Sequence, residues 1–157
     1  MRSLSFAALV LLGACAAPRP ADVTGPVPPP RRVEPAPAEV KDPNFILIVS
    51  ESVPNPDDDG ISFTKVFADG KEVGKTAVGR KAEERTLRLK LPVGNQPIRL
   101  EQWVLPGVGE WSRLADSLQP RERFARVEDG SIVRLELRFA EGEASNTLTV
   151  SREAAAR

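Results

Sequence analysis

Residues 133–139 read Val-Arg-Leu-Glu-Leu-Arg-Phe, a strict alternation of apolar and charged side chains. Successive side chains of a β-strand point to opposite faces, so this stretch predicts a strand with one face in a core and one in water. Asp129-Gly130 precedes the stretch and Glu141-Gly142 follows it, and both dipeptides are typical of turns. The stretch therefore predicts an all-β fold with antiparallel strands.

Similar strand patterns recur earlier in the chain. Residues 87–91 alternate leucine with arginine and lysine, residues 45–49 form a continuous apolar run, and residues 61–68 are rich in β-branched and aromatic side chains. With the turns between them, these runs predict a single antiparallel β-sandwich of about seven strands, of the immunoglobulin or transthyretin kind, over residues 45–151. Residues 152–157 are expected to fray.

The first fourteen residues predict a signal peptide that is removed. An arginine at position 2 is followed by a short apolar run over residues 4–12, and a membrane-spanning helix would need about 20 such residues. Residues 12–15 read Leu-Gly-Ala-Cys, which resembles a bacterial lipobox, and the lone cysteine of the chain falls on the required position. The resemblance implies that Cys15 becomes the lipidated first residue. The alternative is an ordinary secretory signal with an incidental cysteine.

The segment after the signal predicts a tether. Residues 15–44 contain nine of the fifteen prolines and few large apolar residues, so we expect the lipidated cysteine to be followed by a disordered, solvated spacer. Ala16 follows the cysteine, where the inner-membrane retention signal of enteric bacteria is an aspartate. By resemblance to that sorting rule, the protein is expected on the outer membrane, facing the periplasm. A proline-motif ligand is the alternative reading of the spacer.

Composition excludes several functions. Lys and Arg number 22 and Asp and Glu number 22, a neutral balance that argues against binding of nucleic acid. The chain has no histidine, the commonest general base and a common metal ligand, and no cofactor is expected besides the lipid on Cys15. Ser62 and Lys65 match the S-x-x-K pattern of penicillin-binding enzymes, but within a strand these positions face opposite sides. The chain is therefore predicted not to be an enzyme.

One resemblance supports the fold. Residues 66–76 read Val-Phe-Ala-Asp-Gly-Lys-Glu-Val-Gly-Lys-Thr, which resembles the opening hairpin of bacterial PEGA-type domains. Residues 91–94, Leu-Pro-Val-Gly, are similar to the turn before a later strand of that family. These domains are small immunoglobulin- or transthyretin-like sandwiches on envelope proteins. The tetrapeptide that names the family is absent, and the resemblance, over about forty residues, implies fold and location but no activity.

Four residues near the longest apparent loop are candidates for a binding site. Trp111 lies in a glycine-rich segment, where an aromatic ring can stack on a sugar, anchor a partner or instead fold back and cap the sandwich. Arg113, Arg121 and Arg123 suit a carboxylate-bearing partner such as a peptidoglycan peptide. The alternative is that these arginines lie on the solvated face of a strand.

A calcium site is a weaker candidate. Asn55, Asp57 and Asp59 place oxygen atoms at alternate positions before a glycine, as in the first half of a calcium-binding loop. Val66 stands where such a loop has its bidentate glutamate. A solvated turn without metal is the simpler interpretation.

Together these features predict an envelope lipoprotein whose sandwich binds a protein partner. Strand addition to an exposed sheet edge is the expected contact, and the expected role is an accessory or assembly component of a membrane-associated complex. The alternative is a module that binds peptidoglycan or another glycan through Trp111 and its neighbouring arginines.

Overall fold

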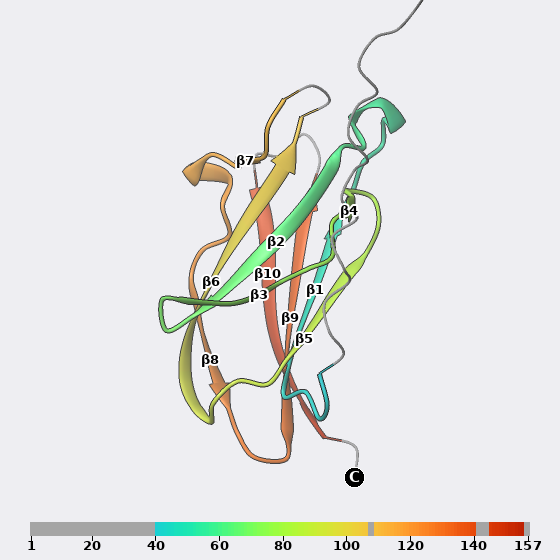
Figure 1. Ribbon diagram of the computed structural model, residues 1–157. Coiled ribbons are helices and arrows are strands. Elements are labelled where there is room, and N and C mark those ends of the chain that lie inside the picture. Colours follow the sequence, from blue (N-terminus) through green and yellow to red (C-terminus); the bar gives the residue numbers. More distant parts are fainter. Residues whose placement is uncertain (1–39, 107–108, 141–144, 156–157) are drawn as a thin grey trace, which may run out of the picture. The chain divides into compact units, whose positions relative to one another are not determined.

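A computed structural model describes residues 40–106, 109–140 and 145–155, which form two packed β-sheets and no α-helix (Figure 1). None of the described helices is long and apolar enough to cross a membrane. The elements are β1 (Phe45–Glu51), η1 (Pro56–Asp58), β2 (Ile61–Ala68), β3 (Lys71–Lys75), β4 (Gly79–Arg80), β5 (Arg85–Leu89), β6 (Gly94–Leu105), β7 (Ser112–Arg113), η2 (Asp116–Leu118), β8 (Arg123–Val127), β9 (Ser131–Ala140) and β10 (Ser145–Ala154), where η marks a 3-10 helix.

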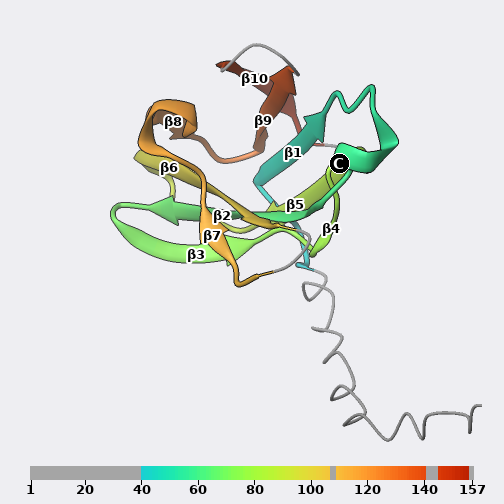
Figure 2. The same ribbon diagram turned by 90° about the horizontal axis from the view of Figure 1, so that it is seen from above.

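The two sheets have different strand orders. One sheet has the order β10-β9-β1-β5. In the other, β2 and β6 pair along their length, β3 and β4 lie on the free side of β2, and β7 and β8 lie on the free side of β6. Figure 2 shows them as two layers, with β1, β9 and β10 in one and β2, β3 and β6 in the other.

The core lies between the layers and confirms the predicted alternation. Val133, Leu135 and Leu137 are buried on the inner face of β9, whereas Arg138 is exposed on the outer face. Complete burial of a leucine side chain stabilises the folded state by about 1.5–3 kcal/mol. The face of each strand that carries the apolar side chains therefore turns inward. The other large members of the core are Phe45, Leu47, Val49, Val66, Leu87, Ile98, Leu100 and Val127.

One strand pairing corrects the prediction of a wholly antiparallel fold. β1 runs parallel to β9, from Phe45 opposite Val133 to Glu51 opposite Phe139. Parallel neighbours need a long crossover connection, and here the chain forms β2, β3, β4, β6, β7 and β8 of the other sheet between β1 and β9. All other strand pairs are antiparallel.

The number of strands and the C-terminal boundary also differ from the prediction. Three strands are additional: β4 and β7 have two residues each, and β8 carries two arginines and an outward phenylalanine that obscure its alternation. The predicted frayed tail from residue 152 is wrong for residues 152–154, which continue β10. They pair with Val133, Ile132 and Ser131, because β9 is long enough to provide partners for all ten residues of β10.

The sheets close against each other along β3 and β5. Gly74 lies so near the neighbouring sheet that a Cβ atom there would be 3.0 Å from Cδ2 of Leu89 and 3.5 Å from Cδ2 of Leu87. Arg85, on the same strand as these leucines, donates from Nη1 to the carbonyl oxygen of Ser62 on β2 at 2.5 Å. We call this side of the sandwich, defined by Gly74, Arg85, Leu87 and Leu89, the closed edge.

Candidate functional site

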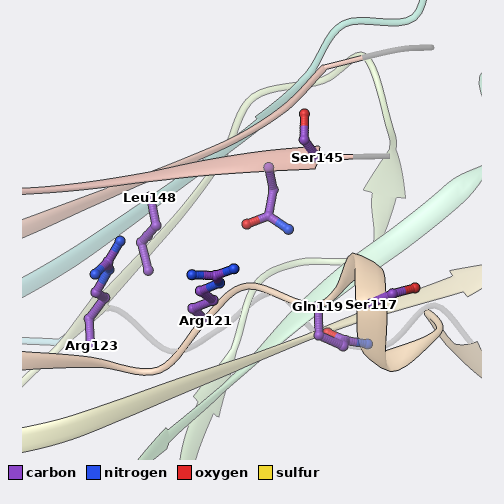
Figure 3. A pocket seen from close by; sticks show the side chains of 7 residues that line it. Ser117, Gln119, Arg121, Arg123, Ser145 and Leu148 are labelled. Atoms are coloured by element: carbon purple, nitrogen blue, oxygen red, sulfur yellow. The ribbon is translucent and has the colours of Figure 1, made fainter. Parts of the chain in front are cut away.

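The opposite side of the sandwich contains a polar pocket. Arg121 and Arg123 rise from the start of β8 and the segment before it toward Leu148 on β10 (Figure 3). The pocket has a volume of about 340 Å3. Two guanidinium groups in one polar pocket suit an anion with paired oxygens, such as a carboxylate. The remaining lining residues are Ser117 in η2, Gln119 directly after it, and Ser145 and Asn146 at the start of β10.

Hydrogen bonds at two points join the walls of this side. Asn146 Nδ2 donates to the carbonyl oxygen of Leu118 at 2.9 Å and so ties β10 to η2. Farther along β10, Arg152 Nη2 donates to the carbonyl oxygen of Arg126 at 2.9 Å. Between these points Leu148 is half-buried and Val150 is 42% exposed. We call this side, defined by Arg121, Arg123, Leu148 and Val150, the open edge.

Gln119 fixes the wall from which the arginines project. Its Oε1 accepts from the amide of Gln102 at 2.9 Å, and its Nε2 donates to the carbonyl oxygens of Gln102 and Leu114 at 3.2 and 2.8 Å. These bonds hold the segment before β8 against β6. The pocket wall is therefore anchored to the sheet, although Arg121 and Arg123 themselves are exposed.

Trp111 and Arg113 lie elsewhere, so the structure divides the four predicted site residues into two pairs. Trp111 packs edge-on against Phe63, with ring centroids 4.8 Å apart, and remains 37% exposed. Arg113 pairs with Asp116 and lies 3.8 Å from Glu101, so carboxylates already neutralise its charge. The ring of Trp111 both covers Phe63 and keeps an exposed surface, which leaves the capping and the contact interpretations compatible.

The outer face of β2 and β6 carries an aromatic row with cations. The rings of Phe63 and Trp103 lie parallel, with centroids 6.1 Å apart. Lys65 Nζ is 5.4 Å from the centroid of Trp103, and the Arg99 guanidinium lies 3.9 Å from that of Phe67. Cation–π contacts of this kind contribute about 0.5–1 kcal/mol at exposed sites. The row follows from the outward phase of the two strands, where odd-numbered residues point away from the core.

The residues of the weak calcium candidate form a hydrogen-bonded turn, the simpler of the two interpretations. Asn55 Oδ1 accepts from the amide of Asp57 at 3.3 Å and caps η1. Asp59 Oδ1 accepts from the amide of Ala82 at 3.0 Å, and its other oxygen lies 3.5 Å from Arg80. Within residues 40–106, 109–140 and 145–155, no three His, Cys, Asp or Glu side chains gather as a metal site would require. Asn55 Oδ1 and Asp59 Oδ1 thus accept from backbone amides, and Asp58 Oδ2 accepts from Asn55 Nδ2.

A buried polar cluster at the closed edge was missed in the sequence. Arg85 is 5% exposed, and its Nη1 also donates to Ser62 Oγ at 2.6 Å, while Nε and Nη2 have no hydrogen-bond partner among the residues that the structure describes. Burial lowers the pKa of Arg85, and the nearby carboxylates of Glu51 and Glu83 raise it in part. The sequence did indicate that Arg85 points inward, because it alternates in step with the buried Leu87 and Leu89.

The S-x-x-K pair is separated as the strand period predicts. Ser62 is fully buried on the inner face of β2, and Lys65 lies on the outer face, where its Nζ is 2.9 Å from Glu72. A lysine on the other face of the sheet is out of reach as a base for this serine.

Cys15, the predicted lipidation site, lies outside the described residues. Comparison with protein-family models, with curated proteins and with solved structures found no match.

Proposed function

We propose that the protein is a membrane-anchored envelope lipoprotein whose sandwich binds an extended segment of a protein partner along β10. The observation that supports this is the character of that strand. β10 is ten residues long, keeps an unbroken register with β9, and pairs with no other strand in the described parts of the chain. Its residues 145–151 read Ser-Asn-Thr-Leu-Thr-Val-Ser and contain no charge, proline or glycine.

The other sheet edges have features that discourage strand addition. β3 has five residues, carries lysine at both ends, and its pairing with β2 has an irregularity between Val66 and Phe67. β5 and β8 also have five residues each, with arginines along them. Short length, edge charges and bulges are devices by which native proteins prevent edge pairing, so their absence from most of β10 favours that edge as the binding surface.

The strand order favours the transthyretin-like form of the two sandwich types. In immunoglobulin constant domains the first strand shares a sheet with the second. Here β1 lies between β5 and β9, and β2 belongs to the other sheet. Nuclear Overhauser contacts between Leu47 and Leu135 would check this, because those residues face each other only if β1 pairs with β9.

Site-specific cross-linking in cells tests the edge contact. A photo-reactive phenylalanine analogue is placed at position 149 on β10 or, as the control, at position 86 on β5; both are exposed threonines. We expect one envelope protein, identified by mass spectrometry, to be captured repeatedly from position 149 and not from position 86. Equal capture from both positions, or capture from neither, would contradict the proposal.

The anchor is part of the same proposal. Several acyl chains on Cys15 would hold the protein on a membrane, since each buried methylene contributes about 0.8 kcal/mol. A Cys15→Ser variant is expected to leave the membrane fraction and to lose incorporation of labelled palmitate. Unchanged fractionation of this variant would remove the anchor from the proposal.

A second candidate function is binding of peptidoglycan or another glycan. The partly exposed ring of Trp111 beside Phe63 favours it, because an aromatic face supported from below can stack on a sugar. Trp111→Ala should then abolish retention of the protein on purified cell-wall sacculi, with Phe124→Ala, another exposed aromatic, as the control. Retention that is the same for both variants would remove this candidate.

A further inference from the structure

If the proposed strand addition holds, the side chains of the open edge determine which sequences can bind beside β10. Asn146, Leu148 and Val150 pair with Phe139, Leu137 and Leu135 of β9 and so point to the inner face of their sheet. Leu137 and Leu135 are completely buried, whereas Leu148 is half-buried and Val150 is 42% exposed. The inner face thus continues past β9 without being fully covered by the other sheet.

Arg121 and Arg123 stand across this uncovered strip. Arg123 pairs with Ile98 in the register of β8 and β6, so its side chain has the inward phase of the buried Ile98, yet it is exposed because the sheet ends there. Arg121 precedes β8 and lines the same pocket. Figure 3 shows both guanidinium groups on the side that faces β10.

These two charges are uncompensated within the described residues. Neither Arg121 nor Arg123 forms an ion pair there, whereas Arg113, Arg126 and Arg152 each lie within ion-pair distance of a carboxylate oxygen. The difference is not one of exposure, since all five side chains are exposed. The pocket therefore has a net positive charge that no described neighbour removes.

A strand added beside β10 would bring its own side chains to this charge. Neighbouring strands lie about 4.8 Å apart, and alternate side chains of the added strand would project on the same face as Leu148 and Val150. That face is the one that Arg121 and Arg123 approach from the other sheet. Carboxylates on a strand at this position would be within the region that the two guanidinium groups line, and they would form charge-assisted hydrogen bonds.

We infer that the segment bound by β10 is acidic on one face: an extended stretch of a protein partner with Asp or Glu at alternate positions turned toward Arg121 and Arg123. Main-chain pairing with β10 would supply a contact that is independent of sequence. The two arginines would select the register and exclude segments with lysine at the same positions, because like charges at that distance repel.

Peptide binding to the full chain in detergent micelles tests the inference. The probes are two labelled nine-residue peptides, one of alternating Glu and Val and one of alternating Lys and Val, followed by fluorescence anisotropy. We expect the Glu peptide to bind about tenfold more tightly at low salt, because two attractive charge pairs replace two repulsive ones. Arg121→Glu combined with Arg123→Glu should reverse this preference. Arg88→Glu, an exposed arginine of β5 without an ion pair, should leave it unchanged.

Hydrogen exchange of the same complexes separates this inference from the proposed function. Bound acidic peptide should slow exchange of the amides in residues 145–151. If both peptides protect β10 equally, or the charge reversal has no effect on the preference, the acidic segment is wrong and strand addition stands. If the acidic peptide binds while β10 stays unprotected, the pocket is a site for anions alone, and both the edge contact and the acidic strand are overturned.

Discussion

The two sheets of the sandwich are packed tightly together at one side and leave a partly exposed strip at the other. At the closed edge, Gly74 lets β3 approach Leu87 and Leu89 at van der Waals distance, and Arg85 reaches from one sheet to Ser62 on the other. At the open edge, two hydrogen-bonded points join the sheets, and the strip between them keeps Val150 exposed.

The contrast is clearest in the arginines. Arg85 is buried and its Nη1 donates hydrogen bonds to Ser62 on the other sheet, whereas the guanidinium groups of Arg121 and Arg123 are exposed and bond to no described residue. A buried guanidinium that holds two sheets together is a structural group, whereas two exposed guanidinium groups without an ion pair in the described parts of the chain, beside the free edge of β10, are available for a ligand. The same residue type thus stabilises the fold at one edge and is available for binding at the other, and its position relative to the sheet edges decides between the two.

The largest expected effect is on core packing at the closed edge. Leu87→Ala should lower the free energy of unfolding by about 2–5 kcal/mol, because it leaves a cavity beneath β3. Leu148→Ala at the open edge should lower it by only about 1 kcal/mol, since that side chain is half-buried in the folded state. Urea denaturation of both variants checks the comparison, and equal losses would show that the two edges are packed alike.

A smaller effect is expected from the buried arginine. Arg85→Ala leaves the carbonyl oxygen and hydroxyl of Ser62 without this donor and should cost about 1–3 kcal/mol. Because burial lowers the pKa of Arg85, the unfolded chain binds this proton more tightly. At neutral pH the charge therefore opposes folding. Arg85→Met and Arg85→Ala both remove this charge, and Arg85→Met should cost less because it leaves a smaller cavity.

Arg88→Ala on the exposed face of β5 serves as the matched control for these variants. Its unfolding free energy should differ from that of the parent chain by no more than about 0.5 kcal/mol. A loss at position 88 as large as that at position 85 would contradict the structural role assigned to the buried guanidinium.

The smallest expected effect on the free energy of unfolding is at the open edge. Arg121→Glu together with Arg123→Glu should change the free energy of unfolding by less than about 0.5 kcal/mol, because neither side chain has an ion pair to lose. Thermal denaturation measures this directly. A clear loss of stability would mean that these arginines support the fold, and any effect of the variant on binding would then need a different explanation.

Much of the fold follows from local patterns. The alternation over residues 133–139 and 87–91 correctly placed leucines inward and charges outward. Arg85 also obeys the alternation, but a charged residue in the buried phase can be interpreted only when the acceptor on the other sheet is known. β8 was missed because Arg123, Phe124 and Arg126 obscure the two inward residues, Ala125 and Val127.

The candidate site was predicted only in its residue types. Trp111 and Arg121 are ten positions apart, and their nearness in sequence suggested a common site. The intervening chain first pairs as β7 with one end of β6 and then forms η2. It next pairs as β8 with the other end of β6. Each pair of residues therefore belongs to a different surface, which no local pattern could specify.

The sequence by itself determined which face of the predicted strands turns inward, that the described chain is all-β, and that Leu12 to Cys15 resembles a lipidation motif. Those properties depend on side-chain period and on short motifs, which are local. The tertiary structure alone decided that β1 pairs in parallel with β9, that one edge is closed and the other open, and that Arg121 and Arg123 lie beside an edge strand, β10. Strand order joins residues far apart in the chain, and it depends on how two whole sheets bury their apolar faces against each other.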